Sequence, residues 1–180
     1  MRGHQPSGRK RVAVIGLGRF GTSVAMVCHD LGYDVTAIDI SERRVAAATD
    51  FATLAAQADG ADKDALLALG VGRSEVCVVA QGQNTEASIS CALVLKQIGV
   101  PWVIAKAKTD LHGQILDKVG ADRIVYPEKE AGNQVAHSLD IRHDVDYMNL
   151  TSTSGVARLT VPDHAVGKSL AQIEEHGAGV

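Results

Sequence analysis

A short apolar run that leads directly into three spaced glycines constrains the fold of this chain more than any other feature. Val12 to Ile15 is followed at once by Gly16-x-Gly18-x-x-Gly21, where a helical pattern of apolar residues begins. In such a strand–turn–helix unit the first glycine permits the tight turn, the second lets a phosphate approach bare backbone, and the third lets the helix pack close to the sheet. The amides and dipole of the helix favour an anion there. The pattern predicts a nucleotide-binding turn; the alternative is a glycine-rich turn without a ligand.

The same strand–turn–helix unit recurs along most of the chain. Apolar residues recur at helical spacing between the apolar runs, and glycines such as Gly32 and Gly99 follow as stop signals. Alternating strands and helices with right-handed crossovers predict an α/β fold of the Rossmann type, a doubly wound parallel sheet of about six strands in the order 3-2-1-4-5-6. The predicted strands are residues 11–15, 34–39, 53–58, 75–80, 102–107 and 123–126.

Two of the predicted helices begin at residues that can cap them. Ser41 is expected to cap the second helix and Asp110 the fifth. The fifth helix carries Leu111, Ile115 and Val119 on one face.

The repeating pattern ends after Leu139. Two short strands, at Tyr147–Leu150 and Val156–Val161, and a brief helix at Ser169–Glu174 are expected beyond it. About 40 residues of mixed short elements do not readily bury a core of their own, so we interpret them as a linker and the start of a second lobe that is cut short. The predicted divisions are a disordered tail at 1–9, a nucleotide-binding domain at 10–139, a linker at 140–155 and the incomplete lobe at 156–180.

Composition narrows the classes of protein to consider. With 46% hydrophobic but only 3% aromatic residues, the chain can bury a core that must be aliphatic. A net charge of −3 argues against a nucleic-acid-binding protein. No apolar run approaches the ~20 residues of a membrane helix, and the N-terminus lacks a signal-peptide stretch, so we expect a soluble, cytosolic protein. Cys28, Cys77 and Cys91 have no metal-like spacing and are interpreted as buried small hydrophobic residues.

Asp39 is the acidic residue whose position is most informative. It ends the second predicted strand, close to the offset of ~20 residues expected for a carboxylate that binds ribose. Such a carboxylate can take both ribose hydroxyls and would repel a 2′-phosphate, which disfavours NADP. The alternative is an acid that caps the helix after Ser41.

Three further charged residues lie where predicted strands end or a helix begins. Asp59 closes the third strand near the adenine end of the predicted crevice, or it is a turn residue before Asp62. Lys106 ends the fifth strand, where a cation can meet a phosphate or is simply solvated. Glu128 begins the sixth helix, either as a carboxylate favoured by the helix dipole or as a ligand or metal contact. The turn at Gln81–Asn84 is expected at the same crevice.

The sequence shows no catalytic constellation. The seven histidines form no metal-ligand spacing, and there is neither a nucleophile-elbow sequence nor an arguable His–Asp pair. A dehydrogenase normally needs a second domain to supply substrate and acid–base groups. The sequence therefore predicts a nucleotide site without catalytic machinery, and a truncated NAD-dependent dehydrogenase is kept as the alternative.

Five motifs carry a resemblance to a known family: Gly16-Leu-Gly-Arg-Phe-Gly21, Asp39-Ile-Ser-Glu42, Ala105-Lys-Ala107, the run from Gly120 to Lys129, and Val166-Gly-Lys-Ser-Leu170. They are similar to motifs of the RCK family, also called TrkA-N domains, the cytosolic regulatory subunits of Ktr/Trk potassium uptake systems. The match is nearest the Ktr type. It covers about residues 10–139, and 156–175 resembles the opening of the family's C-terminal lobe.

The resemblance implies a regulatory protein that is not an enzyme. It implies a gating ring that binds ATP or ADP, or alternatively NAD(H), and drives a membrane pore. The implied partners are a second copy in a homodimer, a larger ring (an octamer in the family) and an integral membrane potassium-translocating subunit. The sixth helix, near Ala131–Leu139, would pair two lobes. The chain would then be cytoplasmic, peripheral at the inner face of the cell membrane through its membrane partner.

The resemblance also implies roles for single residues. Arg19, Lys106 and Glu128 match residues that sense a terminal phosphate, and Glu128 can join a divalent cation, Mg²⁺ or Ca²⁺. One departure is Ala58-Asp59-Gly60-Ala61 where the family has Gly-Asp-Ala-Thr, which leaves the adenine contact open. The implied nucleotide contacts are Gly16, Gly18 and Gly21 on phosphate, Asp39 on ribose, Asp59 near adenine, and Arg19, Phe20, Lys106 and Glu128.

Overall fold

The computed structural model describes residues 8–82, 84–139, 146–149, 155–158, 161 and 166–169. The chain splits into two compact units, residues 1–127 and 128–180. Most of the expected tail at 1–9 and of the linker at 140–155, and all but the first residue of the helix expected at Ser169–Glu174, lie outside the described residues.

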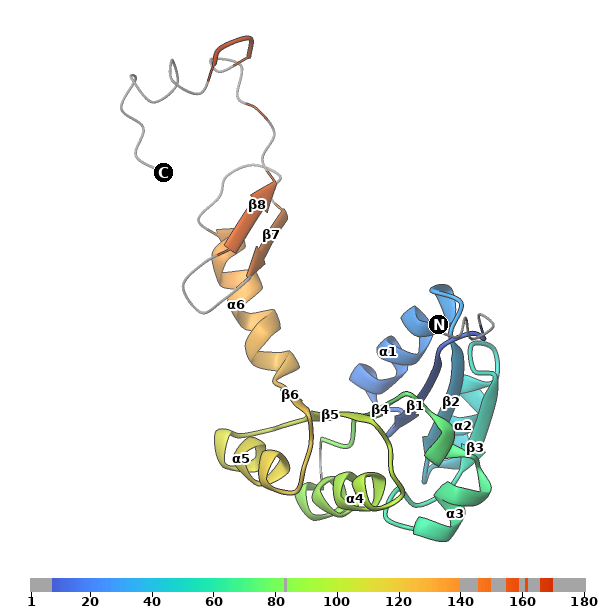
Figure 1. Ribbon diagram of the computed structural model, residues 1–180. Coiled ribbons are helices and arrows are strands. Elements are labelled where there is room, and N and C mark those ends of the chain that lie inside the picture. The colour runs from blue at the N-terminus through green and yellow to red at the C-terminus, as the bar shows by residue number, and fades with distance from the viewer. Residues whose placement is uncertain are drawn as a thin grey trace, which may run out of the picture. The chain divides into compact units, whose positions relative to one another are not determined.

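The first unit is built on six parallel strands: β1 (Arg11–Ile15), β2 (Asp34–Asp39), β3 (Leu54–Gln57), β4 (Val76–Val79), β5 (Trp102–Lys106) and β6 (Arg123–Val125). Their order in the sheet is β3-β2-β1-β4-β5-β6 (Figure 1), which confirms the predicted doubly wound Rossmann-type fold. Ile15 pairs with Ile38 of β2 on one side and with Val79 of β4 on the other. The carboxyl ends of these three strands therefore meet where the strand order reverses, which is where such sheets bind ligands.

Helices cover both faces of this sheet: α1 (Arg19–Asp30), α2 (Glu42–Ala48), α3 (Lys63–Ala68), the 3₁₀ turn η1 (Val71–Arg73), α4 (Thr85–Gln97) and α5 (Asp110–Lys118). Successive β1 residues belong to opposite cores. Val12 and Val14 pack in the core that holds buried alanines of α1 and α2, whereas Ala13 and Ile15 pack in the core that holds buried leucines of α3, α4 and α5. Both alternations of the strand are apolar because both faces are covered, and Figure 1 shows α1 and α4 on opposite sides of the sheet.

The start and the buried face of α5 differ from the prediction. The hydroxyl oxygen of Thr109, not the carboxylate of Asp110, accepts a hydrogen bond from the His112 amide (3.2 Å) and caps the helix. Leu111 is 67% exposed and Ile115 36%, so these two residues of the predicted apolar face point away from the core, whereas Val119 packs against it. The face that packs on the sheet instead carries His112, Gly113 and Leu116.

Most of the remaining described residues belong to the second unit. Helix α6 (Pro127–Leu139) begins one residue before the expected start, and its first turn carries Glu128 and Glu130. Strands β7 (Asp146–Asn149) and β8 (Gly155–Arg158) pair antiparallel, near the two short strands that the sequence predicts. Among the described residues, no helix is both long and apolar enough to span a bilayer.

Candidate functional site

The loop between β1 and α1 lies at the switch point of the sheet, and each of its glycines has a different geometry. Gly16 has a φ of +97°, a conformation that strains any residue with a Cβ, and its amide donates to the Ile38 carbonyl (2.8 Å). A Cβ on Gly21 would collide with the Gly16 carbonyl oxygen. Gly18 is the N-cap of α1, and apart from Gly18 and its two chain neighbours no described atom lies within 4 Å of the position its Cβ would take. The open backbone at Gly18 leaves the first amides of α1 accessible to an anion.

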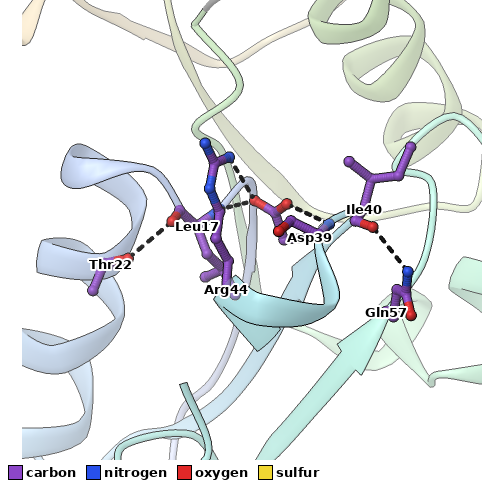
Figure 2. A network of polar contacts seen from close by, with 7 residues as sticks. Leu17, Thr22, Asp39, Ile40, Arg44 and Gln57 are labelled. Atoms are coloured by element: carbon purple, nitrogen blue, oxygen red, sulfur yellow. Dashed lines mark hydrogen bonds and ion pairs between the residues drawn. The ribbon is translucent and has the colours of Figure 1, made fainter. Parts of the chain in front are cut away.

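The carboxylate of Asp39 joins this loop to the start of α2. Asp39 is 3% exposed. Its Oδ2 accepts from the Leu17 amide (2.6 Å) and from Nη1 of Arg44 (3.4 Å), and its Oδ1 accepts from the Ser41 amide (2.8 Å), as Figure 2 shows in part. Ser41 holds the N-cap position of α2, as predicted, but its side chain makes no capping bond within the described structure. Asp39 thus bonds the start of α2 and also lies beside the glycine-rich loop, so both interpretations of this residue stay open.

Lys106 and Phe20 lie close together at the start of α1. Lys106 ends β5, and its Nζ lies 5.8 Å from the centroid of the Phe20 ring at the start of α1. The Lys106 side chain also lies close to Gly82: a Cβ built on Gly82 would lie 3.3 Å from Nζ of Lys106. The aromatic face attracts the ammonium group. A positive charge is therefore held beside the amides that are open to an anion.

Gln81, the residue after Ala80 and β4, lies between two loops of the crevice. A Cβ on Gly16 would lie 2.9 Å from Cγ of Gln81, and one on Gly60 would lie 2.9 Å from its Nε2. The Oε1 atom is buried and accepts no hydrogen bond from the described residues. A buried acceptor without a donor is costly, so a ligand hydroxyl or amino group would be favoured there. Sequence reasoning placed Gln81 in a turn at the crevice but did not identify it as a contact.

The two other predicted acids have different surroundings. Asp59 is exposed, and its Oδ1 accepts from the Ala61 amide (2.9 Å), so its carboxylate is bonded within its own turn. Glu128 lies in the first turn of α6, in the second unit, where a carboxylate is favoured by the helix dipole. Within the described part of the chain, no three His, Cys, Asp or Glu side chains are grouped so that they could hold a metal ion. The roles of Asp59 and Glu128 in ligand binding stay predictions.

An open groove of about 660 Å³ runs along α1 beside the crevice, a volume in the range of small-molecule sites. Arg19 and Arg44 bring two positive charges to the end of α1 where Gly18 lies, and Asp30 lies at the opposite end of the helix. Arg44 was missed by sequence reasoning, although its position five residues after Asp39 was the available signal. The lining residues are Leu17, Gly18, Arg19, Thr22, Ser23, Met26, Val27, Asp30 and Arg44.

The cysteines belong to the core rather than to the site. Cys77 and Cys91 are fully buried, as interpreted from the sequence, whereas Cys28 is only half-buried. Burial raises the pKa of the Cys77 thiol to about 12, against smaller opposing effects of hydrogen bonds. The thiolate is therefore absent at neutral pH, and Cys77 is unsuited to nucleophilic chemistry.

Known proteins are similar to the first unit in both sequence and fold. The family model of the TrkA-N domain matches residues 12–127. Ktr system potassium uptake protein A of Bacillus subtilis (strain 168) is 38% identical over 161 residues, which are 89% of this chain and 72% of that protein. The TrkA-N domain of Escherichia coli inner membrane protein ybaL has a TM-score of 0.66 at 16% identity and covers 74% of this chain and 99% of its own. The GsuK channel bound to NAD has a TM-score of 0.61 at 13% identity and covers 81% and 26%.

Proposed function

The chain belongs to the TrkA-N domain family, and we propose that it is a nucleotide-sensing regulatory subunit of a potassium uptake system. The observation that carries the proposal is the crevice at the sheet's switch point. It combines an open glycine backbone at Gly18, a buried carboxylate at Asp39 and a held cation at Lys106. The name of the Bacillus subtilis relative supports the link to potassium uptake, and the NAD-bound GsuK channel supports a nucleotide in this fold.

The ligand is an adenine nucleotide, ATP or ADP, with NAD(H) as the alternative. Its phosphates would lie over Gly18 and the first amides of α1, where the helix dipole favours an anion. Arg19 and Lys106 would supply positive charge, and Asp39 would accept from the ribose hydroxyls. Gln81, whose buried Oε1 has no donor among the described residues, would take a hydroxyl or amino group of the nucleoside.

Regulation follows from differential affinity. A nucleotide can shift an equilibrium between two conformations only as far as it binds one of them better. Arg19 is the candidate sensor of a terminal phosphate, and Glu128 would repel that phosphate unless a divalent cation, Mg²⁺ or Ca²⁺, lay between them. The chain would bind the nucleotide and change conformation, and a membrane potassium-translocating subunit would change its transport activity in turn.

Assembly is part of the same proposal. The exposed apolar residues Leu111 and Ile115 of α5 offer a surface that a second copy of the chain would cover. The family resemblance supplies the rest of this proposal. Two copies form a homodimer, homodimers form a larger ring, and the ring attaches to the inner face of the membrane through the membrane partner. No catalytic turnover is expected of the assembly.

Calorimetric titration of ATP and ADP into the protein, with and without Mg²⁺, tests the proposal. Arg19→Ala should weaken ATP about tenfold, or ~1.4 kcal/mol, and ADP less, whereas Arg43→Ala, which removes an exposed arginine of α2 outside the groove lining, should change neither. Mg²⁺ should strengthen ATP binding in the wild type but not in Glu128→Gln. Absence of binding of both nucleotides to the wild type would refute the nucleotide site. Sustained NADH oxidation with a panel of carbonyl substrates would instead identify a dehydrogenase.

A further inference from the structure

We propose that Arg44 is a specificity-determining residue that lets the ribose subsite accept an adenosine nucleotide carrying a 2′-phosphate. The inference rests on the proposed function, because it concerns the same crevice. Asp39 alone would repel a 2′-phosphate, as expected from the sequence. The structure places the Arg44 guanidinium 3.4 Å from Oδ2 of that carboxylate, so the subsite contains one negative and one positive charge.

The hydrogen bonds of Asp39 identify the contact that a ribose would displace. Each carboxylate oxygen offers about two acceptor positions. Both positions of Oδ2 are used, by the Leu17 amide and by Arg44, and one of Oδ1 is used by the Ser41 amide. A ribose diol that donates two hydrogen bonds therefore needs the free position on Oδ1 and one that is now taken. The Arg44 contact, at 3.4 Å, is the longest of the three and the one that would yield.

Arg44 is free to move while Asp39 is not. The Arg44 side chain is 51% exposed and that of Asp39 is 3% exposed, and Figure 2 shows the two facing each other beside Leu17. A displaced guanidinium would stay close to the ribose hydroxyls because its helix, α2, begins three residues after Asp39. Its planar fork of donors matches phosphate oxygens in a bidentate geometry. In this fold an acid at this position binds the ribose 2′-hydroxyl, whereas a nearby arginine accommodates a 2′-phosphate.

The charges around Arg44 support an anionic occupant. Arg19 lines the same groove and adds a second positive charge, whereas Asp30 lies at the far end of α1. Glu42, in the first turn of α2, is exposed and solvated. The 2′-phosphate would thus meet the Arg44 guanidinium, in a groove that also holds Arg19, and a single buried carboxylate that is already bonded to two backbone amides.

Calorimetry with 5′-AMP and adenosine 2′,5′-bisphosphate isolates the 2′-phosphate, and ADP serves as the reference ligand. We expect wild-type protein to bind the bisphosphate no more than about tenfold more weakly than 5′-AMP. Arg44→Gln should weaken the bisphosphate at least tenfold more than it weakens 5′-AMP. Arg43→Gln removes the same charge one residue earlier on α2 and should leave the ratio of the two dissociation constants unchanged. Both side chains are exposed, so thermal midpoints should match the wild type and confirm that both variants fold.

Two results would overturn the inference while leaving the proposed function intact. In the first, the wild type binds ADP and 5′-AMP but binds the bisphosphate more than tenfold more weakly than 5′-AMP. In the second, the factors by which Arg44→Gln weakens 5′-AMP and the bisphosphate differ by less than tenfold. Arg44 would then only support Asp39. Failure of the wild type to bind ADP at all would instead refute the nucleotide site itself, and this inference with it.

Discussion

Replacing Gly21 by alanine should destabilise the fold, whereas the same change at Gly18 should not. A Cβ on Gly21 would collide with the Gly16 carbonyl oxygen and would lie 2.9 Å from Cβ of Ala80 and 3.0 Å from the Gly16 carbonyl carbon. Two of these atoms are backbone, so the loop or α1 must shift. Overpacking of this kind lowers the free energy of unfolding by about 3 kcal/mol, and the higher helix propensity of alanine offsets about 1 kcal/mol of that loss. The expected net loss is ~2 kcal/mol.

Thermal denaturation followed by circular dichroism measures this loss. For a chain of this size the midpoint should fall by about 4–8 °C in Gly21→Ala. Gly18→Ala is the matched control: Gly18 has an ordinary extended backbone, φ −76° and ψ −173°, and no described atom within 4 Å of the added group. Its midpoint should stay within about 2 °C of the wild type. Equal midpoints for all three proteins would show that α1 does not depend on the close approach at Gly21. The bulkier Gly18→Val should keep the fold and abolish nucleotide binding, since its side chain fills the space over the amides.

Two further predictions concern pH and assembly. Burial lowers the pKa of His112, whose Nδ1 accepts a hydrogen bond from the Lys108 amide (3.3 Å). The stability that neutral His112 contributes is complete above its unfolded pKa of about 6.5. This stability is lost as the pH falls through the lowered folded pKa. The thermal midpoint should therefore drop more steeply between pH 7.5 and 5.5 in the wild type than in His112→Gln, and parallel curves would contradict this. Light scattering at micromolar concentration should give a dimer or larger even assembly that Leu111→Glu shifts towards monomer, because Leu111 is 67% exposed beside Ile115. A monomeric wild type would count against the pairing.

The fold could be predicted closely because its signals are local. Buried parallel strands read as continuous apolar runs, and all six predicted strands lie within one residue of the observed ends. The buried face of α5 could not be predicted from apolar spacing. Gly113 is buried so close to Tyr126 that a Cβ there would collide with the Tyr126 hydroxyl, and the adjacent His112 is buried as well. This close contact selects glycine at position 113, and apolar spacing does not indicate a face made of His112, Gly113 and Leu116.

The site was only partly readable for a related reason. The loop glycines and Asp39 have fixed spacings that follow from strand and helix geometry, so the sequence locates them at one crevice. Arg44 and Gln81 reach the crevice through side-chain conformation: one bonds Asp39, and the other spans the loops that hold Gly16 and Gly60. The position of Arg44 five residues after Asp39 was a signal for the first contact, whereas no spacing rule specifies the contacts of Gln81.

The packing around Gly60 also limits how such a site can be redesigned. A Cβ on Gly60 would lie 2.7 Å from Cγ2 of Ile15, 2.9 Å from Nε2 of Gln81 and 3.1 Å from Sγ of Cys91. Gly16 and Gly21 are enclosed as well, so the floor of the crevice accepts no larger side chain without displacing neighbouring atoms. The rim is different, because Arg44 and Arg19 stand in solvent. A laboratory library that aims to change ligand preference would gain most from varying the rim and leaving the floor untouched.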